Sequence, residues 1–533
     1  MVAACNETKS ADNQNITVPE ADITSEKTLH AENKASLLTA SLEYVEFEQF
    51  EELYLSTEPT LSIWPRLRAG FQLPDEVNHK SLQNEIEWFA RHHGYMQRVM
   101  RRADPFLHYI LEEAEKRNLP TELVLLPIVE SAYQPFAYSH GRAAGIWQFI
   151  PSTGRLYGLK QNWWYDGRRD IYASTKAALN YLENLNKLFK GDWMLALAAY
   201  NSGSGTVQRA VKRNKKLKRP TDFWHLNLPK ETRTYVPKLL ALKEIISKPE
   251  LYSVSLRCIP DAPGFRQVKT NAQIDLALAA ELAELDLETL YNYNPAFNRW
   301  ATDPDGPHNL ILPIASADAF EKNYSKLPAD KHLRWSRHKI KSGETLSHIA
   351  VKYNTSVKHL RKVNNIRGNN IRAGKYIMIP VSSRNNSSYA LSSAQRLKTT
   401  QNIKHGSNST RINHLVQNGE SFWTISRKYN VDMHKLAKWN GMAVRDPLRK
   451  GQKLVIWSSS SRTASIKTHN PNNTIKSISY TVRNGDSLSR IASKYRVDVK
   501  DLHRWNTIKG KYIQPGQRLK LYIDVTEQSG RQG

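Results

Sequence analysis

Size and charge limit the classes of protein to which this chain of 533 residues can belong. The formal net charge is +27, but residues 331–533 hold 39 Lys and Arg against 9 Asp and Glu, so the first 330 residues are near neutral. The length predicts several domains, the two cysteines exclude a disulfide framework or a thiolate metal cluster, and no apolar run of about 18 residues is available to span a membrane. Residues 1–60 are polar and acidic, which predicts a flexible N-terminal segment.

The first residues, Met1-Val2-Ala3-Ala4-Cys5, resemble the end of a bacterial lipoprotein signal, where the cysteine is lipidated. The charged and apolar regions that precede such a cysteine are missing, so either the start is truncated or the match is accidental. A lipid on Cys5 would anchor the protein to a membrane without spanning it. We expect this anchor.

Residues 61–104 predict a helical, aromatic-rich lead-in, and residues 105–250 predict a helical core. Within the core, the apolar run Leu119–Tyr133 holds one carboxylate near its end, Glu130. A charge among apolar neighbours is unfavourable unless it is paired, exposed or protonated, and burial raises the pKa of a carboxyl toward the range that a general acid needs. The alternative is that Glu130 faces solvent from an amphipathic helix, although Pro127 argues against a regular helix there.

A buried helix is predicted over Trp193–Ala199, because this stretch is apolar nearly all round. Tyr200 and Asn201 follow at its end, before Gly203 and Gly205 break it. Polar residues at the end of a buried helix tend to line a site, and the alternative is that they only satisfy the helix terminus.

Four short motifs follow one another between residues 130 and 235. They are Glu130-Ser131, Gly145-Ile146-Trp147-Gln148, Ala199-Tyr200-Asn201 and Glu231-Thr232-Arg233-Thr234-Tyr235. Together they resemble the catalytic domain of the lytic transglycosylases with a goose-type lysozyme fold, and the flanking residues resemble the membrane-bound D-type subgroup. Each motif alone is unspecific, but four in this order are specific.

Three repeats occupy the basic half of the chain. Each has a Gly, a Tyr ten residues later, an Asn twenty-one residues later and a Gly thirty-one or thirty-two residues later. These residues are Gly343, Tyr353, Asn364 and Gly374; Gly419, Tyr429, Asn440 and Gly451; and Gly485, Tyr495, Asn506 and Gly516. The repeats resemble LysM modules, βααβ folds that bind glycans containing N-acetylglucosamine, and they are predicted at 337–381, 412–457 and 479–523. The polar segments 382–411 and 458–478 between them predict flexible linkers.

A fourth, degenerate copy is predicted at 265–314, because its apolar residues and Asn294 lie 70 positions ahead of those of the first repeat. Gln273 replaces the opening Gly and Ala283 replaces the Tyr, so we expect weak or no glycan binding. The alternative is an ordinary two-helix connector. The expected fold class is therefore multidomain: a mainly α lysozyme-like catalytic domain, then three βααβ LysM modules, with the degenerate module between.

The resemblance implies a single catalytic carboxylate, Glu130, acting as acid and then base on the glycan strands of peptidoglycan. It implies substrate-binding roles for a set of residues around it, and no cofactor or metal. The set is Ser131, Gly145, Trp147, Gln148, Tyr200, Asn201 and Tyr235. For Trp147, stacking on a sugar ring and simple packing both remain open. We predict that Asp170 caps a helix and that Asp166 lies in a turn.

The expected partners are peptidoglycan glycan strands, with an anionic envelope surface as a second candidate for the basic half. Nucleic acid is not expected, because no binding motif accompanies the charge. We expect a monomer in the periplasm, anchored at the outer membrane. Two other functions remain open: a muramidase, which is a hydrolase on the same fold, and a non-catalytic scaffold that binds peptidoglycan.

Overall fold

The computed structural model describes residues 61–75, 79–139, 141–407, 409–459 and 475–524, apart from 484, 496, 498, 507 and 509–512. The predicted N-terminal segment with Cys5, and most of the predicted linker 458–478, lie outside the described residues. The chain divides into two compact units. The first comprises residues up to Ile403 with Asn413–Ile456, and the second comprises Lys404–Ile412 with the residues from Trp457 onward.

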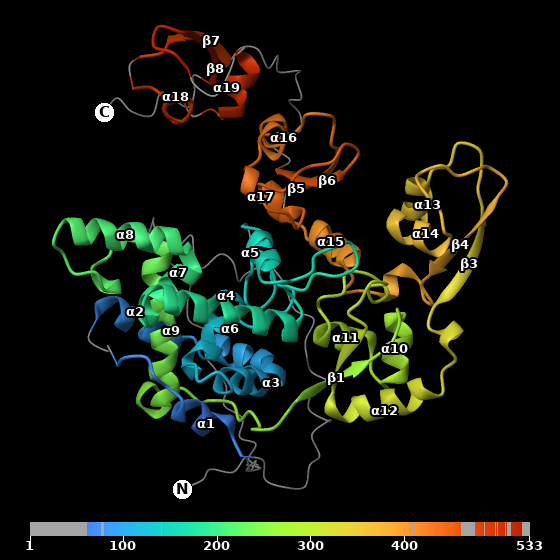
Figure 1. Cartoon of the computed structure of the whole chain (residues 1–533), viewed down its shortest axis with the longest axis horizontal. Coiled ribbons are helices and arrows are strands. Elements are labelled where there is room, and N and C mark those ends of the chain that lie inside the picture. Colours follow the sequence, from blue (N-terminus) through green and yellow to red (C-terminus); the bar gives the residue numbers. More distant parts are fainter. Residues whose placement is uncertain are drawn as a thin grey trace, which may run out of the picture. The chain divides into compact units, whose positions relative to one another are not determined.

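Helices make up the chain from residue 63 to residue 252 (Figure 1). In chain order they are α1 (Ile63–Ala69), α2 (Lys80–Arg91), α3 (His93–Glu115), η3 (Thr121–Leu125), α4 (Leu126–Ser131), α5 (Pro151–Leu156), α6 (Ile171–Leu188), α7 (Trp193–Ser202), α8 (Ser204–Lys216), η4 (Phe223–His225), α9 (Lys230–Ser247) and η5 (Pro249–Tyr252). One continuous hydrophobic core holds them together. The predicted lead-in is part of this core, since α3 runs through the predicted boundary at residue 104.

The centre of this helical core is α7, whose residues from Met194 to Ala199 are all buried, as the sequence predicts. It packs against α6, α8 and α9. Gly203 ends α7 with a φ of 83°, a conformation that glycine adopts without strain. The prediction that Gly205 also breaks this helix is wrong, because Gly205 lies inside α8.

The break predicted near Pro127 is present, although it falls just before the proline. A 3-10 helix, η3, ends at Leu125, and α4 begins at Leu126 with Pro127 in its first turn, where a missing N–H is tolerated. This short α4 ends at Ser131 because Ala132 and Tyr133 both have positive φ, of 50° and 55°. The chain therefore turns sharply directly after Glu130 and Ser131.

Four modules with the order strand, helix, helix, strand follow the helical core. The first, the degenerate copy, has β1 (Phe265–Lys269), α10 (Leu276–Leu282), α11 (Leu287–Tyr293) and β2 (Asn309–Pro313), and α12 (Ile314–Ser325) follows it. The second has β3 (Arg334–Lys339), α13 (Leu346–Lys352), α14 (Val357–Val363) and β4 (Tyr376–Val381), and the third has β5 (Ser409–Leu415), α16 (Phe422–Tyr429), α17 (Met433–Trp439) and β6 (Lys453–Ser459). The fourth has β7 (Ile475–Thr481), α18 (Leu488–Tyr495), α19 (Val499–Trp505) and β8 (Arg518–Asp524). In each module the two strands pair with each other.

One hydrogen-bond pattern recurs in all four modules, and we call it the asparagine clasp. The asparagine after the second helix donates to the carbonyl four residues earlier and exchanges two bonds with one residue of the closing strand. For Asn364 these bonds reach Leu360 O at 2.9 Å, Met378 O at 2.7 Å and Met378 N at 2.7 Å. Asn294, Asn440 and Asn506 make the same three bonds in their modules. The degenerate copy thus shares the internal bonding of the others.

The segment 382–411 differs from the predicted flexible linker. It contains a helix, α15 (Ser393–Asn402), and the buried ring of Tyr389. The Tyr389 hydroxyl donates to the buried carboxylate of Asp275 at 2.9 Å, and Ser383 N donates to the same group at 2.7 Å. One aromatic residue and one buried acceptor therefore order a segment whose overall composition is polar.

Among the described residues, no helix is both long and apolar enough to cross a bilayer. The same residues contain no grouping of His, Cys, Asp and Glu side chains suited to holding a metal ion.

Candidate active site

Glu130 lies in the last turn of α4, and its side chain is only partly exposed. The hydroxyl of Tyr235, on α9, donates a hydrogen bond of 2.6 Å to Oε1 of Glu130. Burial raises the pKa of Glu130 to about 7, the bond from Tyr235 acts in the opposite direction, and the charge of Glu231 raises it further. A carboxyl with this pKa holds a proton near neutral pH and can also release it, which suits a group that must act as acid and then as base.

The loop from Gly145 to Gln148 is held against α4. Ser131 Oγ donates to Ile146 O at 3.0 Å and to Pro127 O at 3.1 Å. The side chain of Gln148 folds back, with Nε2 donating to Gly145 O at 2.7 Å. Ser131 therefore fixes the loop relative to α4, and no bond links its hydroxyl to the Glu130 carboxylate in the described structure.

Gly145 has a structural role that differs from the substrate approach expected for it. Its φ is +78°, and a Cβ placed on it would lie 2.1 Å from the backbone oxygen of Arg168. The glycine thus lets two backbone segments of the core meet. The Arg168 guanidinium strengthens this contact, because it donates to Phe149 O at 3.0 Å and pairs with Asp166 at 2.7 Å.

Trp147 does not serve as the sugar-stacking residue that the sequence left open. Its side chain is fully buried, and its indole N–H donates to Thr175 Oγ1 at 3.0 Å. The ring therefore packs in the core, between the loop and α6. Its backbone is still part of the site, since the hydroxyl of Tyr200 donates to Trp147 O at 2.8 Å.

The structure brings Tyr200 and Tyr235 to Glu130 from two helices, α7 and α9, and Asn201 joins them through Glu231. Burial raises the pKa of the Tyr200 and Tyr235 hydroxyls, and the charge of Glu130 adds to this effect on both, as expected for groups close to one another. Asn201 bridges to the start of α9, where it donates to Glu231 at 3.3 Å and accepts from Thr232 at 2.8 Å. The end of α7 and the start of α9 are thereby joined beside the carboxylate.

The other carboxylates are divided between framework and site. Asp170 caps α6 through Ala173 N at 2.7 Å, which confirms the predicted cap, and it also accepts from Tyr165 at 2.8 Å. Asp166 is occupied by arginines in the turn. The carboxylate that the sequence analysis missed is Glu231, an exposed side chain whose charge acts on Glu130. The sequence feature that could have identified Glu231 is its position in the Glu-Thr-Arg motif, four residues before Tyr235.

Two tyrosines that the sequence did not single out extend the aromatic surface beyond Tyr200. The ring centroid of Tyr181 lies 5.3 Å from that of Tyr200, and the ring of Tyr157 lies 5.1 Å from Tyr181. All three are half-buried. Because they come from α6, the end of α7 and the turn after α5, no sequence spacing links them.

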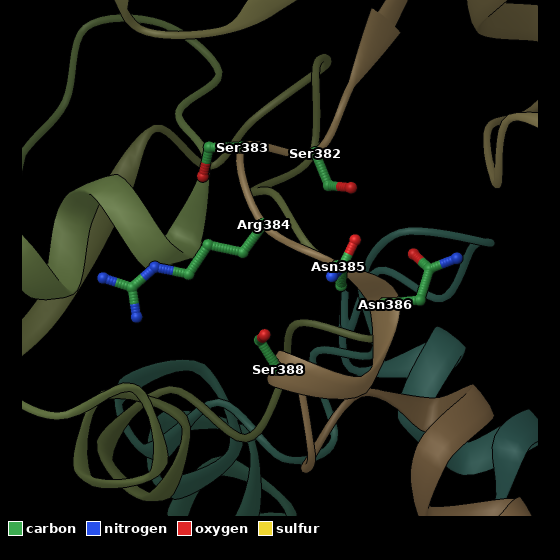
Figure 2. Close-up of a pocket in the computed structure, with 6 residues that line it drawn as sticks. All are labelled: Ser382, Ser383, Arg384, Asn385, Asn386 and Ser388. Atoms are coloured by element: carbon green, nitrogen blue, oxygen red, sulfur yellow. The ribbon is translucent and has the colours of Figure 1, made fainter.

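A polar hollow lies on the segment after β4 (Figure 2). Its lining residues are Ser382, Ser383, Arg384, Asn385, Asn386 and Ser388. None of them is a carboxylic acid, so this hollow lacks the proton donor that glycoside cleavage requires.

Comparison with known families matches both halves of the chain. Residues 108–223 match the transglycosylase SLT domain, residues 264–329 match the LysM-like domain of the lytic transglycosylase MltD, and residues 338–380, 414–457 and 480–521 match the LysM domain. The three LysM matches fall on the three repeats, and the LysM-like match contains the degenerate copy.

Among characterised proteins, the chain is 38% identical over 412 residues to membrane-bound lytic murein transglycosylase D of Escherichia coli (strain K12), which covers 75% of this chain and 87% of that protein. It is 31% identical over 182 residues to an autolysin of Enterococcus faecalis, covering 34% of this chain and 23% of the autolysin. Among solved structures, an inactive mutant of lytic transglycosylase Slt from Pseudomonas aeruginosa is 25% identical, covering 28% of this chain and 24% of that one, with a TM-score of 0.22.

Proposed function

The chain belongs to the family of membrane-bound lytic murein transglycosylase D and is a lytic transglycosylase, and we propose that Glu130 is the single acid and base of its reaction. The observation that carries this assignment is the partly buried Glu130 carboxyl, with a pKa near 7, under a 2.6 Å bond from Tyr235. The substrate is the glycan strand of peptidoglycan, and the LysM modules bind the same glycan.

Glu130 acts in two proton transfers. It first protonates the glycosidic oxygen between N-acetylmuramic acid and N-acetylglucosamine, so that this bond breaks at C1 of the muramic acid. The resulting carboxylate then accepts the proton of the muramic acid C6 hydroxyl, whose oxygen attacks C1. The product ends in a 1,6-anhydro ring and no water is consumed, so one carboxylate suffices where hydrolases use two.

Neighbouring residues supply positioning and charge stabilisation in place of a second carboxylate. The Tyr235 hydroxyl stabilises ionised Glu130 after the first transfer, because its hydrogen bond favours the charged form. Tyr200 is close enough to Glu130 for the charges to interact, and Asn201 is bonded to Glu231. Gln148 lies on the loop held by Ser131. We assign these four residues to substrate binding and orientation.

Mass analysis of the products tests the reaction type. A lytic transglycosylase releases anhydro ends, whereas a muramidase releases reducing ends that are heavier by one water. The hydrolytic alternative has one specific candidate, since Glu231 is close enough to act electrostatically on Glu130. Its exposure and its bond to Asn201 favour a binding role instead. Reducing ends that disappear in Glu231→Gln would reverse this assignment.

The pH dependence of activity should follow Glu130. Since the acid form starts the reaction, kcat/KM should fall tenfold per pH unit above about pH 7. In Tyr235→Phe the ionised carboxylate loses its hydrogen bond, so the Glu130 pKa rises and the falling limb moves to higher pH, while kcat drops by about tenfold to a hundredfold. Initial rates on soluble glycan fragments between pH 5 and pH 9 measure both effects. If the falling limb of the pH profile stayed at the same pH in Tyr235→Phe, the hydrogen bond from Tyr235 would not control the pKa of Glu130.

We also propose an envelope location, because the two Escherichia coli relatives are named membrane-bound. Cys5 is the proposed site of lipid attachment, holding a monomer at the outer membrane with its catalytic core in the periplasm. Labelling with a radioactive fatty acid, with Cys5→Ala as control, tests this anchor. Incorporation that persists in the variant would contradict it.

A further inference from the structure

A dense group of cations follows Tyr200 and Asn201, which lie at the end of α7. Residues 204–219 contain seven basic side chains and no acidic one. They are Arg209, Lys212, Arg213, Lys215, Lys216, Lys218 and Arg219, and all are exposed. Within the described part of the chain, no ion pair neutralises any of the seven. Figure 1 shows their helix, α8, at the outer edge of the helical core.

Four of these cations form one stripe along α8. Arg209, Lys212, Arg213 and Lys216 are spaced i, i+3, i+4 and i+7, which places them on one face of a helix. The buried residues of α8, Val207 and Asn214, lie on the opposite face. We call the four residues the basic stripe. Like charges at this spacing repel and destabilise a helix, so folding alone does not account for the stripe.

The segment after α8 is folded so that the stripe stays uncovered. The buried side chain of Asn214 donates to Pro220 O at 2.7 Å and to His225 O at 2.9 Å, which holds the returning chain against the inner side of the helix. The next carboxylate along the chain, Asp222, is occupied by His225 at 2.8 Å. The stripe is thus an ordered row of charges that points to solvent.

Both ends of the hairpin that carries the stripe come from the active site. It begins directly after Asn201 at the end of α7, and it returns through η4 to α9, which supplies Glu231 and Tyr235. A glycan strand bound at Glu130 carries peptide stems that hold carboxylates, the groups that a row of cations binds. We propose that the basic stripe binds the carboxylates of these stems, an inference that rests on the proposed function.

An anionic membrane surface fits the stripe less well. Helices that lie on membranes turn an apolar face outward with their basic face, whereas the apolar face of α8 is buried in the core. Leu217 is the exposed large apolar side chain of this fully described hairpin, with 49% of its surface accessible. The charges therefore face outward without the apolar surface that membrane insertion needs.

The test is a fourfold variant of the full-length protein: Arg209→Gln, Lys212→Gln, Arg213→Gln and Lys216→Gln. Steady-state kinetics are measured on soluble glycan strands that carry their stems and on strands from which an amidase has removed them. We expect KM to rise about tenfold on stem-bearing strands, with kcat unchanged and no shift in KM on bare strands. The difference should shrink at high salt, because exposed charges are screened.

The matched control removes four exposed cations from the degenerate module and from the segment that follows it: Lys269→Gln, Lys322→Gln, Lys326→Gln and Lys331→Gln. It changes the net charge equally and should leave KM unchanged on both substrates. An unaltered KM in the stripe variant, an equal rise on both substrates, or lost binding to phosphatidylglycerol vesicles in place of a KM change would each overturn the inference. If the wild-type protein released no product from either substrate, the proposed function itself would fail, and a melting curve shows whether the variant is folded.

Discussion

Replacing Glu130 with Gln is expected to lower kcat/KM on peptidoglycan by about 10³–10⁴ while the helical core stays folded. Glutamine keeps the shape of the side chain and still accepts the bond from Tyr235, but it neither gives nor takes the proton. Turbidity of sacculi and release of soluble fragments measure the loss. Glu231→Gln is the control, and because its carboxylate is exposed, its activity should stay within about tenfold of wild type.

Glu130→Gln should also stabilise the folded protein in alkaline solution. The folded pKa of Glu130 is raised to about 7, from an ordinary value of 4.5. The stability that the neutral carboxyl contributes is therefore fully present below pH 4.5 and is lost as pH rises through 7. Glutamine is neutral throughout, so at pH 8 the variant should gain about 1–3 kcal/mol in free energy of unfolding over wild type, and nothing at pH 4. Urea denaturation at the two pH values measures the difference.

Equal stabilities at pH 8, together with retained activity, would mean that Glu130 is an ordinary surface carboxylate. Loss of activity without the gain in stability would leave the catalytic assignment intact and would mean that the carboxyl is well hydrated. The two measurements thus separate the role of the proton from the effect of burial.

The second large effect is expected for Gly145→Ala, which should lower the free energy of unfolding by about 3–5 kcal/mol. Alanine is strained at a φ of +78°, and its Cβ would lie 2.1 Å from the backbone oxygen of Arg168. Since that oxygen belongs to backbone, relief requires the loop to move away from the turn at Arg168 and Arg169, which precedes α6. Urea denaturation measures the loss, and activity should fall with it, because the loop carries Gln148.

Gly158 offers a control for backbone strain alone. Its φ is +77°, nearly that of Gly145, but no atom lies within 4 Å of an added Cβ. Gly158→Ala should therefore cost only about 1–2 kcal/mol, the price of the left-handed conformation. Similar losses in both variants would show that the Arg168 contact relaxes easily and would refute the close-packing role of Gly145.

Local signals in the sequence were sufficient to propose the main parts of the site. A charge in an apolar run alone does not single out Glu130, because the buried Glu122 lies in the same run. The order of the four motifs adds the family resemblance that the comparisons confirm. The Asp170 cap and the buried α7 also follow from local chemistry. In both cases the residues that determine the structure lie within a few positions of one another, so periodicity and composition are enough to predict the cap and the buried helix.

The errors concern residues whose roles depend on distant contacts. Trp147 is indistinguishable in sequence from a sugar-stacking ring, and only its contact with Thr175, from another helix, shows that it packs. The polar composition of the segment 382–411 predicts a linker, yet Tyr389 in this segment donates a hydrogen bond to the buried Asp275, more than a hundred positions away. The repeated Asn was visible from its spacing, but its reason, the asparagine clasp, required the closing strand.

The asparagine clasp also has a consequence for attachment. All three of its bonds stay inside one module, so the clasp that joins the second helix to the closing strand is made in each copy by that copy's own residues. The avidity for the glycan then depends on the number of modules that bind it. Once one module is bound, the next binds at a high effective concentration, so the time that the enzyme stays bound rises steeply with the number of modules. Duplication of a single repeat would thus lengthen the time that the enzyme stays bound to the glycan, and loss of one would shorten it, without altering the rate of bond cleavage.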